Sequence, residues 1–422
     1  MTSRLLSQPA HSSTRLHAPI AGLRSALWIR GDARMASTSS SAETRAALAA
    51  SARILIGEDQ QDVQDALHIL LKGAGYAAES ASTPDAILSK LESGKYDLLL
   101  MDLNYRRDTT SGSEGLEILG ILRNMPAPPP VIVMTAWGSI ELAVQAMHMG
   151  ARDFIQKPWD NNHLLHLAEK HISAHRDETL RKFKQDHELA EAQAVQKRLM
   201  PATLPKISGI DIAGQCQPAG AVAGDYFDVL QLGDNLGICI ADVIGKGLPA
   251  ALMMSNLQAA VKVTAADWVK PSELCKRVNA LACRNGAVDK FISFFYAVYE
   301  PATRNLMYTN AGHNPPMVIR SNGECLRLDT PDVVLGQISD WQYQDAHFQL
   351  EPGDKLVLYT DGMNEAGEQD GNEFGEERLS AFFQQRPAAR ASELLPEVFA
   401  AITEHCHNNF ADDATCLILS VD

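Results

Sequence analysis

The fold of the first half of the chain is decided by the stretch Arg53-Ile54-Leu55-Ile56-Gly57-Glu58-Asp59, in which a short apolar run ends in two acids. Three later segments have the same design of an apolar run and a polar residue after it: Leu98-Leu99-Leu100-Met101 with Asp102, Val131-Ile132-Val133-Met134 with Thr135, and Asp153-Phe154-Ile155-Gln156 with Lys157. Each run is short and is followed by a helical pattern, which is typical of buried parallel strands. Alternating strands and helices predict an α/β fold with a doubly wound parallel sheet.

The polar residues at the ends of these runs predict a shared site. In a doubly wound sheet, ligands bind outside the carboxyl ends of the strands, where these residues lie. The carboxylates of Glu58, Asp59 and Asp102 cannot all stay ionised in one place without a cation, so the cluster predicts bound Mg²⁺. Lys157 and Thr135 beside them suit a phosphoryl group.

Together these residues resemble the receiver domain of two-component response regulators over residues 52–172. The resemblance implies a flavodoxin-like fold, a cognate histidine kinase as partner, and Asp102 as the phosphorylated residue. It also implies that Mg²⁺ is held by Glu58, Asp59, Asp102 and the backbone carbonyl of Asn104.

The same resemblance implies a switch in the receiver. Lys157 pairs with the phosphate, Thr135 responds to it, and Phe154 occupies the position of the switch aromatic residue. The sequence departs from the family in the loop 104–115, which is longer than usual and lacks the usual Pro after the acceptor. The departure leaves the shape of this loop open, but not the chemistry.

Composition bounds the classes of function. A length of 422 residues predicts two to three domains. The net charge of −15 argues against nucleic acid as a partner, because neutralising phosphates takes clustered Lys and Arg. The sequence contains no run of about 18 apolar residues, so we expect no membrane span. The seven scattered cysteines suggest buried thiols in a reducing, cytoplasmic setting.

Two segments outside the domains allow more than one interpretation. Residues 1–50 are rich in Ser, Ala and Arg, and can imitate an organelle transit peptide. We favour a disordered tail, or an over-extended start with the true one at Met35.

Residues 160–200 form a long polar helical pattern with an irregular apolar stripe. Its part at 173–200 is either a plain connecting helix or a signalling helix that forms a dimer seam.

The second half, residues 201–422, has a different pattern. Strand-like runs dominate, at 210–215, 236–241, 292–299, 355–359 and 414–419. A hairpin is expected between Tyr299 and Tyr308. Helical patterns lie at 247–265, 271–284 and 391–406. Clustered strands with separate helices predict an α+β domain of two mainly antiparallel sheets flanked by helices.

Acids beside glycine or at strand ends recur in this half. They are Asp225, Asp242, Asp361 and the pair Asp412-Asp413. Hard oxygen ligands without His or Cys suit Mg²⁺ or Mn²⁺. Two such ions about 3.5–4 Å apart activate water and clamp a phosphoryl oxygen in an in-line displacement. Taken singly, each Asp-Gly pair is more often a turn than a ligand.

Together the motifs resemble the metal-dependent Ser/Thr protein phosphatases of the SpoIIE/RsbU branch over residues 189–421. The matching blocks are Gln196 to Pro201, Gly224 to Asp228, Asp242 to Ala251, Asn310 to Pro316, Leu358 to Gly362 and Phe374 to Leu379. The resemblance implies that Asp242 bridges two Mn²⁺ or Mg²⁺ ions with help from the Val243 carbonyl. Asp361 and Asp412 then complete one ion's ligands, and Asp225 contributes to the other. These four aspartates are the implied catalytic residues.

Other residues of these blocks have weaker implied roles. Asp228 and Asp413 are secondary candidates for ligands. His313 invites an assignment as general acid, but in this branch its block is interpreted as a structural turn. The branch usually has a second glycine where Ala223 stands, and often a small polar residue where Ile244 stands.

The leading hypothesis is a phosphatase controlled by receiver phosphorylation. Its expected substrate is a phosphoserine or phosphothreonine on a protein, by resemblance a STAS-type anti-sigma-factor antagonist in a partner-switching pathway. A cysteine-based phosphatase is excluded, because none of the cysteines is followed by Arg six positions later. The alternative is a non-enzymatic adaptor that binds a sigma factor or another regulator through a phosphatase-like fold. The complete set of acids favours the enzyme.

Overall fold

The computed structural model describes residues 52–105, 112–135, 140–267, 269–285, 290–368 and 371–422. The expectations for residues 1–50, and for the middle of the loop 104–115, therefore lie outside the described residues. The chain divides into two compact units, Met1–Leu180 and Arg181–Asp422. This division falls inside the predicted linker 173–200.

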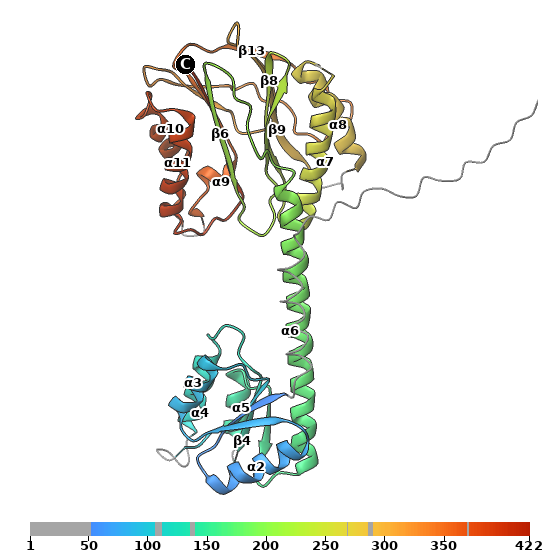
Figure 1. Cartoon of the computed structure of the whole chain (residues 1–422), viewed down its shortest axis with the longest axis vertical. Helices are drawn as coiled ribbons and strands as arrows, with labels where there is room; N and C mark the ends of the chain where they lie inside the picture. Colours follow the sequence, from blue (N-terminus) through green and yellow to red (C-terminus); the bar gives the residue numbers. More distant parts are fainter. Residues whose placement is uncertain (1–51, 106–111, 136–139, 268, 286–289, 369–370) are drawn as a thin grey trace, which may run out of the picture. The chain divides into compact units, whose positions relative to one another are not determined.

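The first unit is built on a five-stranded sheet of order β2-β1-β3-β4-β5 in which all neighbours are parallel (Figure 1). Its strands are β1 Arg53–Gly57, β2 Ala77–Ala81, β3 Leu98–Asp102, β4 Val131–Thr135 and β5 Asp153–Gln156. The connecting helices are α2 Gln61–Gly73, α3 Pro84–Ser93, α4 Ser113–Leu122 and α5 Ile140–His148, and α6 Asn161–Lys197 follows β5. The predicted doubly wound parallel sheet is confirmed.

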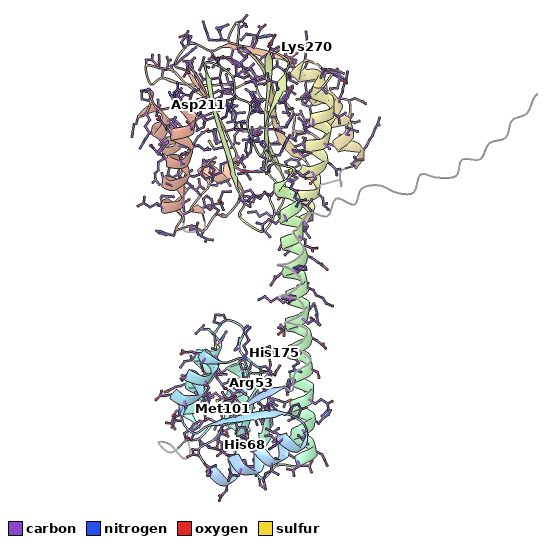
Figure 2. All side chains as sticks on the ribbon, viewed as in Figure 1. Arg53, His68, Met101, His175, Asp211 and Lys270 are labelled. Carbon is purple, nitrogen blue, oxygen red and sulfur yellow. The ribbon has the colours of Figure 1, made fainter. Side chains whose placement is uncertain are left out.

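Alternate residues of the strands feed two separate cores. Leu55, Leu99 and Val133 pack on one face of the sheet with apolar residues of α3 and α4. Ile56 and Leu100 pack on the other face with residues of α2 and α6. Both faces are covered because successive side chains of a strand point to opposite sides. Met101 and Arg53 are labelled within this unit in Figure 2.

Helix α6 begins as part of the receiver core. Leu164, Leu167 and Ile172 are buried in that core. One turn further on, Arg176 donates from Nε to Asp97 Oδ1 at 2.7 Å and from Nη2 to Asp97 Oδ2 at 3.2 Å. The helix runs without a break for 37 residues to Lys197. The polar pattern at 160–200 therefore folds as one helix.

The second unit holds two five-stranded sheets, of order β13-β10-β9-β8-β7 and β12-β11-β14-β15-β6. Every paired neighbour is antiparallel, so the prediction of two antiparallel sheets is confirmed. The strands are β6 Ile210–Gln217, β7 Tyr226–Leu232, β8 Asn235–Val243, β9 Ile292–Glu300, β10 Asn305–Ala311, β11 Met317–Ile319, β12 Cys325–Arg327, β13 Ala346–Gln349, β14 Lys355–Tyr359 and β15 Ala414–Val421. The expected hairpin is the pair β9–β10.

Helices cover the outer faces of these sheets (Figure 1). They are α7 Leu248–Ala265, α8 Pro271–Asn285, α9 Asp361–Asn364, α10 Glu376–Gln384 and α11 Ala391–His405. The apolar residues of α7 and α8 pack on β7–β9, and those of α10 and α11 pack on β11, β14 and β15. A third core lies between the inner faces of the two sheets. Asp211 and Lys270 are labelled in this unit in Figure 2.

Two further findings bear on the expectations from composition. None of the helices in the described ranges combines the length and hydropathy that a membrane crossing needs. All seven cysteines are free thiols, and four of them are buried.

Candidate functional site

The first site lies where β1 and β3 end side by side. Carboxylate oxygens of Glu58, Asp59 and Asp102 lie within 4.8 Å of one another. The side chains of Glu58 and Asp102 are buried, and Asp59 is partly exposed. The structure thus brings together the three acids that the sequence predicts as Mg²⁺ ligands. Three carboxylate oxygens in one place are a donor set that fits a hard divalent cation.

Lys157 faces two of these acids. Its Nζ donates to Glu58 Oε2 at 2.6 Å and to Asp102 Oδ2 at 2.7 Å. Burial raises the pKa of Glu58, and the contact with Lys157 opposes that rise. Burial alone would lower the pKa of Lys157, but the Asp102 and Glu58 carboxylates outweigh it, so the pKa is raised. The ammonium therefore stays charged beside the candidate acceptor.

The remaining receiver candidates lie at the end of β3, at the end of β4 and on β5. Thr135 is the last residue of β4 and is buried, and its backbone carbonyl accepts a hydrogen bond from the Lys157 N–H at 2.8 Å. The Asn104 N–H donates to Asp102 Oδ1 at 3.1 Å. Phe154 lies on β5 with 42% of its surface exposed.

The second site gathers acids that approach from separate elements. Asp242 is near the end of β8, Asp361 begins α9 two residues after the end of β14, and Asp225 and Asp412 precede β7 and β15. Burial, followed by repulsion from Asp361, Asp412 and Asp413, raises the pKa of Asp242 to about 7. These acids therefore lie close enough to Asp242 for their negative charges to raise its pKa.

The same causes act on Asp361, which is partly exposed, and on Asp225, which is buried. Burial and repulsion from Asp412 raise the pKa of Asp361, and burial and repulsion from Asp242 raise that of Asp225. Carboxylates so arranged ionise together only when cations neutralise them. The donor set therefore fits Mg²⁺ or Mn²⁺.

Two threonines that the sequence analysis missed hold Asp225 in place. Thr360 Oγ1 and Thr415 Oγ1 donate to Asp225 Oδ2 at 2.8 Å and 2.6 Å. Asp225 is almost completely buried. Thr360 stands in a block that matches the phosphatase branch, which was the available signal. Thr415 stands in the last strand and has no local signal.

The two secondary candidates have structural partners. Asp228 Oδ2 accepts from Tyr226 Oη at 2.9 Å and pairs with Lys262 Nζ at 3.2 Å. Asp413 accepts from the backbone N–H groups of Ala219 at 2.8 Å and Gly224 at 2.6 Å. Asp228 is thus engaged by the ion pair with α7, and Asp413 ties down the loop before β7.

A cavity of about 240 Å³ lies against these acids. It is lined by Asp242, Ile244, Phe291, Ser293, Gly312, His313, Asn314, Val334 and Asp361. His313 Nδ1 lies 2.8 Å from Ser293 Oγ, and the Asn310 side chain bonds both the backbone N–H and the carbonyl of His313. Burial lowers the pKa of His313 to about 4, so the ring is neutral at pH 7. These features favour the structural role of His313 over that of a general acid.

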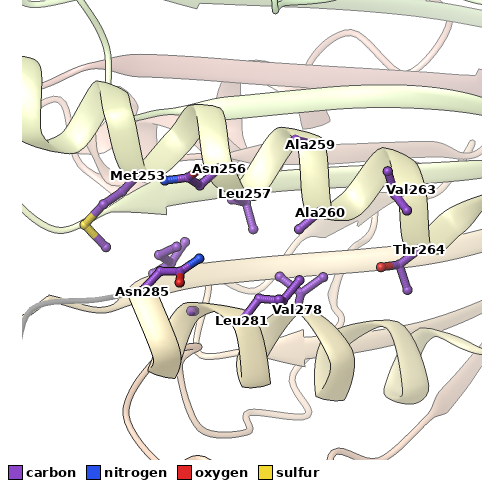
Figure 3. A pocket seen from close by; sticks show the side chains of 12 residues that line it. Met253, Asn256, Leu257, Ala259, Ala260, Val263, Thr264, Val278, Leu281 and Asn285 are labelled. Carbon is purple, nitrogen blue, oxygen red and sulfur yellow. The ribbon is translucent and has the colours of Figure 1, made fainter.

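A larger cavity of about 330 Å³ lies between α7 and α8 (Figure 3). Its walls are mainly apolar, with Met253, Leu257, Val263, Val278 and Leu281 among them. None of the candidate metal ligands lines it. The chemistry of the second unit therefore belongs to the smaller cavity.

Comparison with known proteins supports both units. The family model described as stage II sporulation protein E (SpoIIE) matches residues 233–422, and the response regulator receiver domain model matches residues 54–169. The phosphoserine phosphatase RsbU of Bacillus subtilis (strain 168) is 30% identical over 246 residues, which are 57% of this chain and 73% of RsbU. The response regulator protein FleR of Pseudomonas aeruginosa is 32% identical over 120 residues, which are 28% of this chain and 24% of FleR.

A solved structure supports the fold of the second unit. The SiaA-PP2C domain of Pseudomonas aeruginosa matches with a TM-score of 0.51 at 22% sequence identity, covering 57% of this chain and 98% of that domain. The receiver match, the SpoIIE match and the similarity to RsbU agree with the parallel sheet of the first unit and the antiparallel sheets of the second. The chain belongs to the SpoIIE/RsbU-type metal-dependent protein serine/threonine phosphatases of the PP2C fold, with a response regulator receiver domain fused in front of the phosphatase domain.

Proposed function

We propose that this protein removes phosphate from a phosphoserine or phosphothreonine of a partner protein, at a rate set by phosphorylation of Asp102. The observation that carries this proposal is the set of acids with raised pKa values, of which Asp242 and Asp361 line the 240 Å³ cavity. RsbU and RsbP of Bacillus subtilis, both named phosphoserine phosphatases, favour phosphoserine as the substrate.

In the phosphatase unit, Asp225, Asp242, Asp361 and Asp412 would hold two Mn²⁺ or Mg²⁺ ions, with the Val243 carbonyl as a further ligand. Such ions activate water and neutralise the charge that develops on the phosphoryl oxygens. The other residues of the site position the ligands and line the cavity. The Thr360 and Thr415 hydroxyls fix the Asp225 carboxylate. Ile244, Phe291 and Val334 give the cavity an apolar wall beside the acids.

In the receiver unit, Glu58, Asp59, Asp102 and the Asn104 carbonyl would hold Mg²⁺. A histidine kinase would then supply the phosphoryl group to Asp102, with Lys157 as its counter-charge and Thr135 and Phe154 as the switch. The contact between Lys157 Nζ and Asp102 supports this arrangement.

The substrate we propose is a STAS-type anti-sigma-factor antagonist, and the pathway is partner switching. This assignment is supported by the family to which the phosphatase unit belongs. The adaptor alternative predicts a site that has lost its ligands. The four aspartates and the threonines that hold Asp225 favour the enzyme instead.

The test measures phosphate release from a serine-phosphorylated STAS domain by the full chain with Mn²⁺. Beryllofluoride, a mimic of the aspartyl phosphate, is added to the wild type and to the matched Asp102→Asn variant. We expect beryllofluoride to change the wild-type rate and to leave the variant's rate unaltered. Absence of Mn²⁺-dependent hydrolysis of both this substrate and p-nitrophenyl phosphate would refute the enzymatic proposal. An equal response of both chains would refute control by Asp102.

A further inference from the structure

The end of helix α6 contributes a buried glutamine to the phosphatase unit. Gln196 Nε2 donates to the Ala223 carbonyl at 2.7 Å, and Gln196 Oε1 accepts from the Ala223 N–H at 2.8 Å. Only 8% of the Gln196 surface is exposed. One side chain therefore satisfies both backbone groups of a single residue.

The geometry of this pair depends on the amide. The backbone groups of Ala223 are buried, and buried peptide groups need partners. A primary amide offers a donor and an acceptor on one planar group, as a neighbouring peptide would. Gln196 thus takes the place of a strand partner at a point where β7 has not yet begun. The segment it holds is Ala223-Gly224-Asp225.

The other residues of this segment are held from different directions. The Gly224 N–H donates to Asp413 Oδ2 at 2.6 Å. A Cβ atom on Gly224 would lie 3.1 Å from the Val243 carbonyl oxygen, so the segment packs closely on a proposed ligand of the ions. The Asp225 carboxylate accepts from two threonines. Gln196 is the support that comes from α6.

The end of α6 has a second attachment. Gln258 of α7 donates from Nε2 to the Leu199 carbonyl at 3.1 Å. Helix α7 begins five residues after Val243, so it starts beside the same ligand set. Gln258 lies ten residues into α7, so Leu199 anchors the chain after α6 to the body of this helix, and Gln196 makes the contact that leads to the site.

We propose that Gln196 is a positioning residue, which fixes the backbone of residues 223–225 so that Asp225 meets its metal ion. This inference rests on the proposed role of Asp225 as a metal ligand. Because Gln196 acts through Ala223, its loss should weaken metal binding more than it slows turnover at saturating metal. A movement of the α6 end would reach the metal site through the same contact.

The test is calorimetric titration of Mn²⁺ into the metal-free full chain. The Gln196→Met variant keeps the length of the side chain and removes both hydrogen bonds. Gln196→Glu keeps an acceptor for the Ala223 N–H and removes the donor. The exposed Gln193 lies one turn earlier on α6, and Gln193→Met is the matched control. Receiver binding of Mn²⁺ is common to all these chains and cancels in the comparison.

We expect the Mn²⁺ dissociation constant to rise about tenfold or more in Gln196→Met, the effect of one or two lost buried hydrogen bonds. In assays of p-nitrophenyl phosphate hydrolysis, kcat at saturating Mn²⁺ should stay within a few-fold of the wild type. Gln193→Met should match the wild type in both measurements. Wild-type affinity in a folded Gln196→Met chain would overturn the proposal.

Two further outcomes are decisive. If circular dichroism shows that both Gln196 variants fail to fold, Gln196 is a folding residue and the proposal is overturned. Asp225→Asn serves as the reference for the underlying assignment. If Asp225→Asn binds Mn²⁺ as tightly as the wild type, the metal role of Asp225 fails, independently of whether Gln196 holds the segment.

Discussion

Replacing Asp242 by asparagine should stabilise the metal-free protein at pH 8, although it should abolish turnover. Burial, and then repulsion from three neighbouring acids, raises the pKa of Asp242 from an ordinary value of 3.8 to about 7. The folded protein therefore holds this proton more tightly than the unfolded chain does. The resulting stabilisation is fully present below about pH 4 and is lost as the pH rises to about 7.

The size of the effect follows from the shift. About three pKa units, from 3.8 to about 7, correspond to roughly 4 kcal/mol of unfavourable free energy in the ionised folded state. Asparagine carries no charge and avoids this cost above pH 7. For a unit of this size, about 1 kcal/mol corresponds to 2–4 °C in Tm, so the variant should gain on the order of 10 °C. At pH 5 the gain should be smaller, because folded Asp242 is then protonated.

The assay is thermal unfolding of the full chain in EDTA at pH 5 and pH 8, followed by circular dichroism. Asp340→Asn removes the same charge from an exposed position and is the matched control. Adding Mn²⁺ at pH 8 should raise the Tm of the wild type more than that of Asp242→Asn, because both chains keep the receiver site and only the wild type keeps Asp242. The reasoning is refuted if Asp242→Asn is no more stable than the wild type at pH 8 in EDTA.

Four other changes have defined outcomes. Asp361→Asn removes a proposed ligand and should lower kcat/KM with Mn²⁺ by more than about a hundredfold, because losing a residue that only supports a ligand already costs up to about a hundredfold. Near-normal turnover would contradict the two-ion site. Acetyl phosphate with Mg²⁺ should label Asp102, so mass spectrometry should find no phosphate on Asp102→Asn. Thr415→Val removes a donor to Asp225, and should raise the Mn²⁺ dissociation constant about tenfold, because a hydrogen bond to a charged group contributes about 1.5–3 kcal/mol. Beryllofluoride should change the association state of the full chain in light scattering and leave a 189–422 fragment unchanged. If the association state of the full chain does not change, the receiver does not control the phosphatase through dimerisation.

Much of the fold could be predicted because buried strands leave a strong local pattern. Leu98-Leu99-Leu100-Met101 is apolar throughout, since both faces of β3 are covered. By contrast, β2 has the sequence AAESA and is only partly buried, so it gave no such signal. The three-residue strands β11 and β12 were also missed. β11 pairs with β14, which lies far along the chain, and β12 pairs with β11.

The residues of the candidate sites also differ in whether the local sequence indicates them. Acids at strand ends could be chosen as candidates because of their position: Asp102 ends the apolar strand β3, and Asp361 follows β14 after Thr360. The contacts of Gln196 with Ala223 and of Thr415 with Asp225 join residues that are distant in sequence. No periodicity encodes such pairs, since they arise only when the sheets pack. The raised pKa of Asp242 likewise depends on neighbours that the fold supplies.

The lysines beside the two acid clusters have a consequence for how the chain acquires its ions. Lys157 pairs with Glu58 and Asp102, and Lys246 Nζ lies 2.9 Å from Asp412 Oδ2. Each ammonium is a counter-ion carried by the chain itself, so a newly synthesised molecule closes both clusters at a lower electrostatic cost before any ion arrives. An ion that bound at Asp412 would have to displace the Lys246 ammonium from this carboxylate. The free energy of ion binding would therefore be reduced by the strength of that ion pair. If the proposed ions bind at these acids, the concentration of free Mn²⁺ or Mg²⁺ would then set what fraction of the molecules carries a complete site.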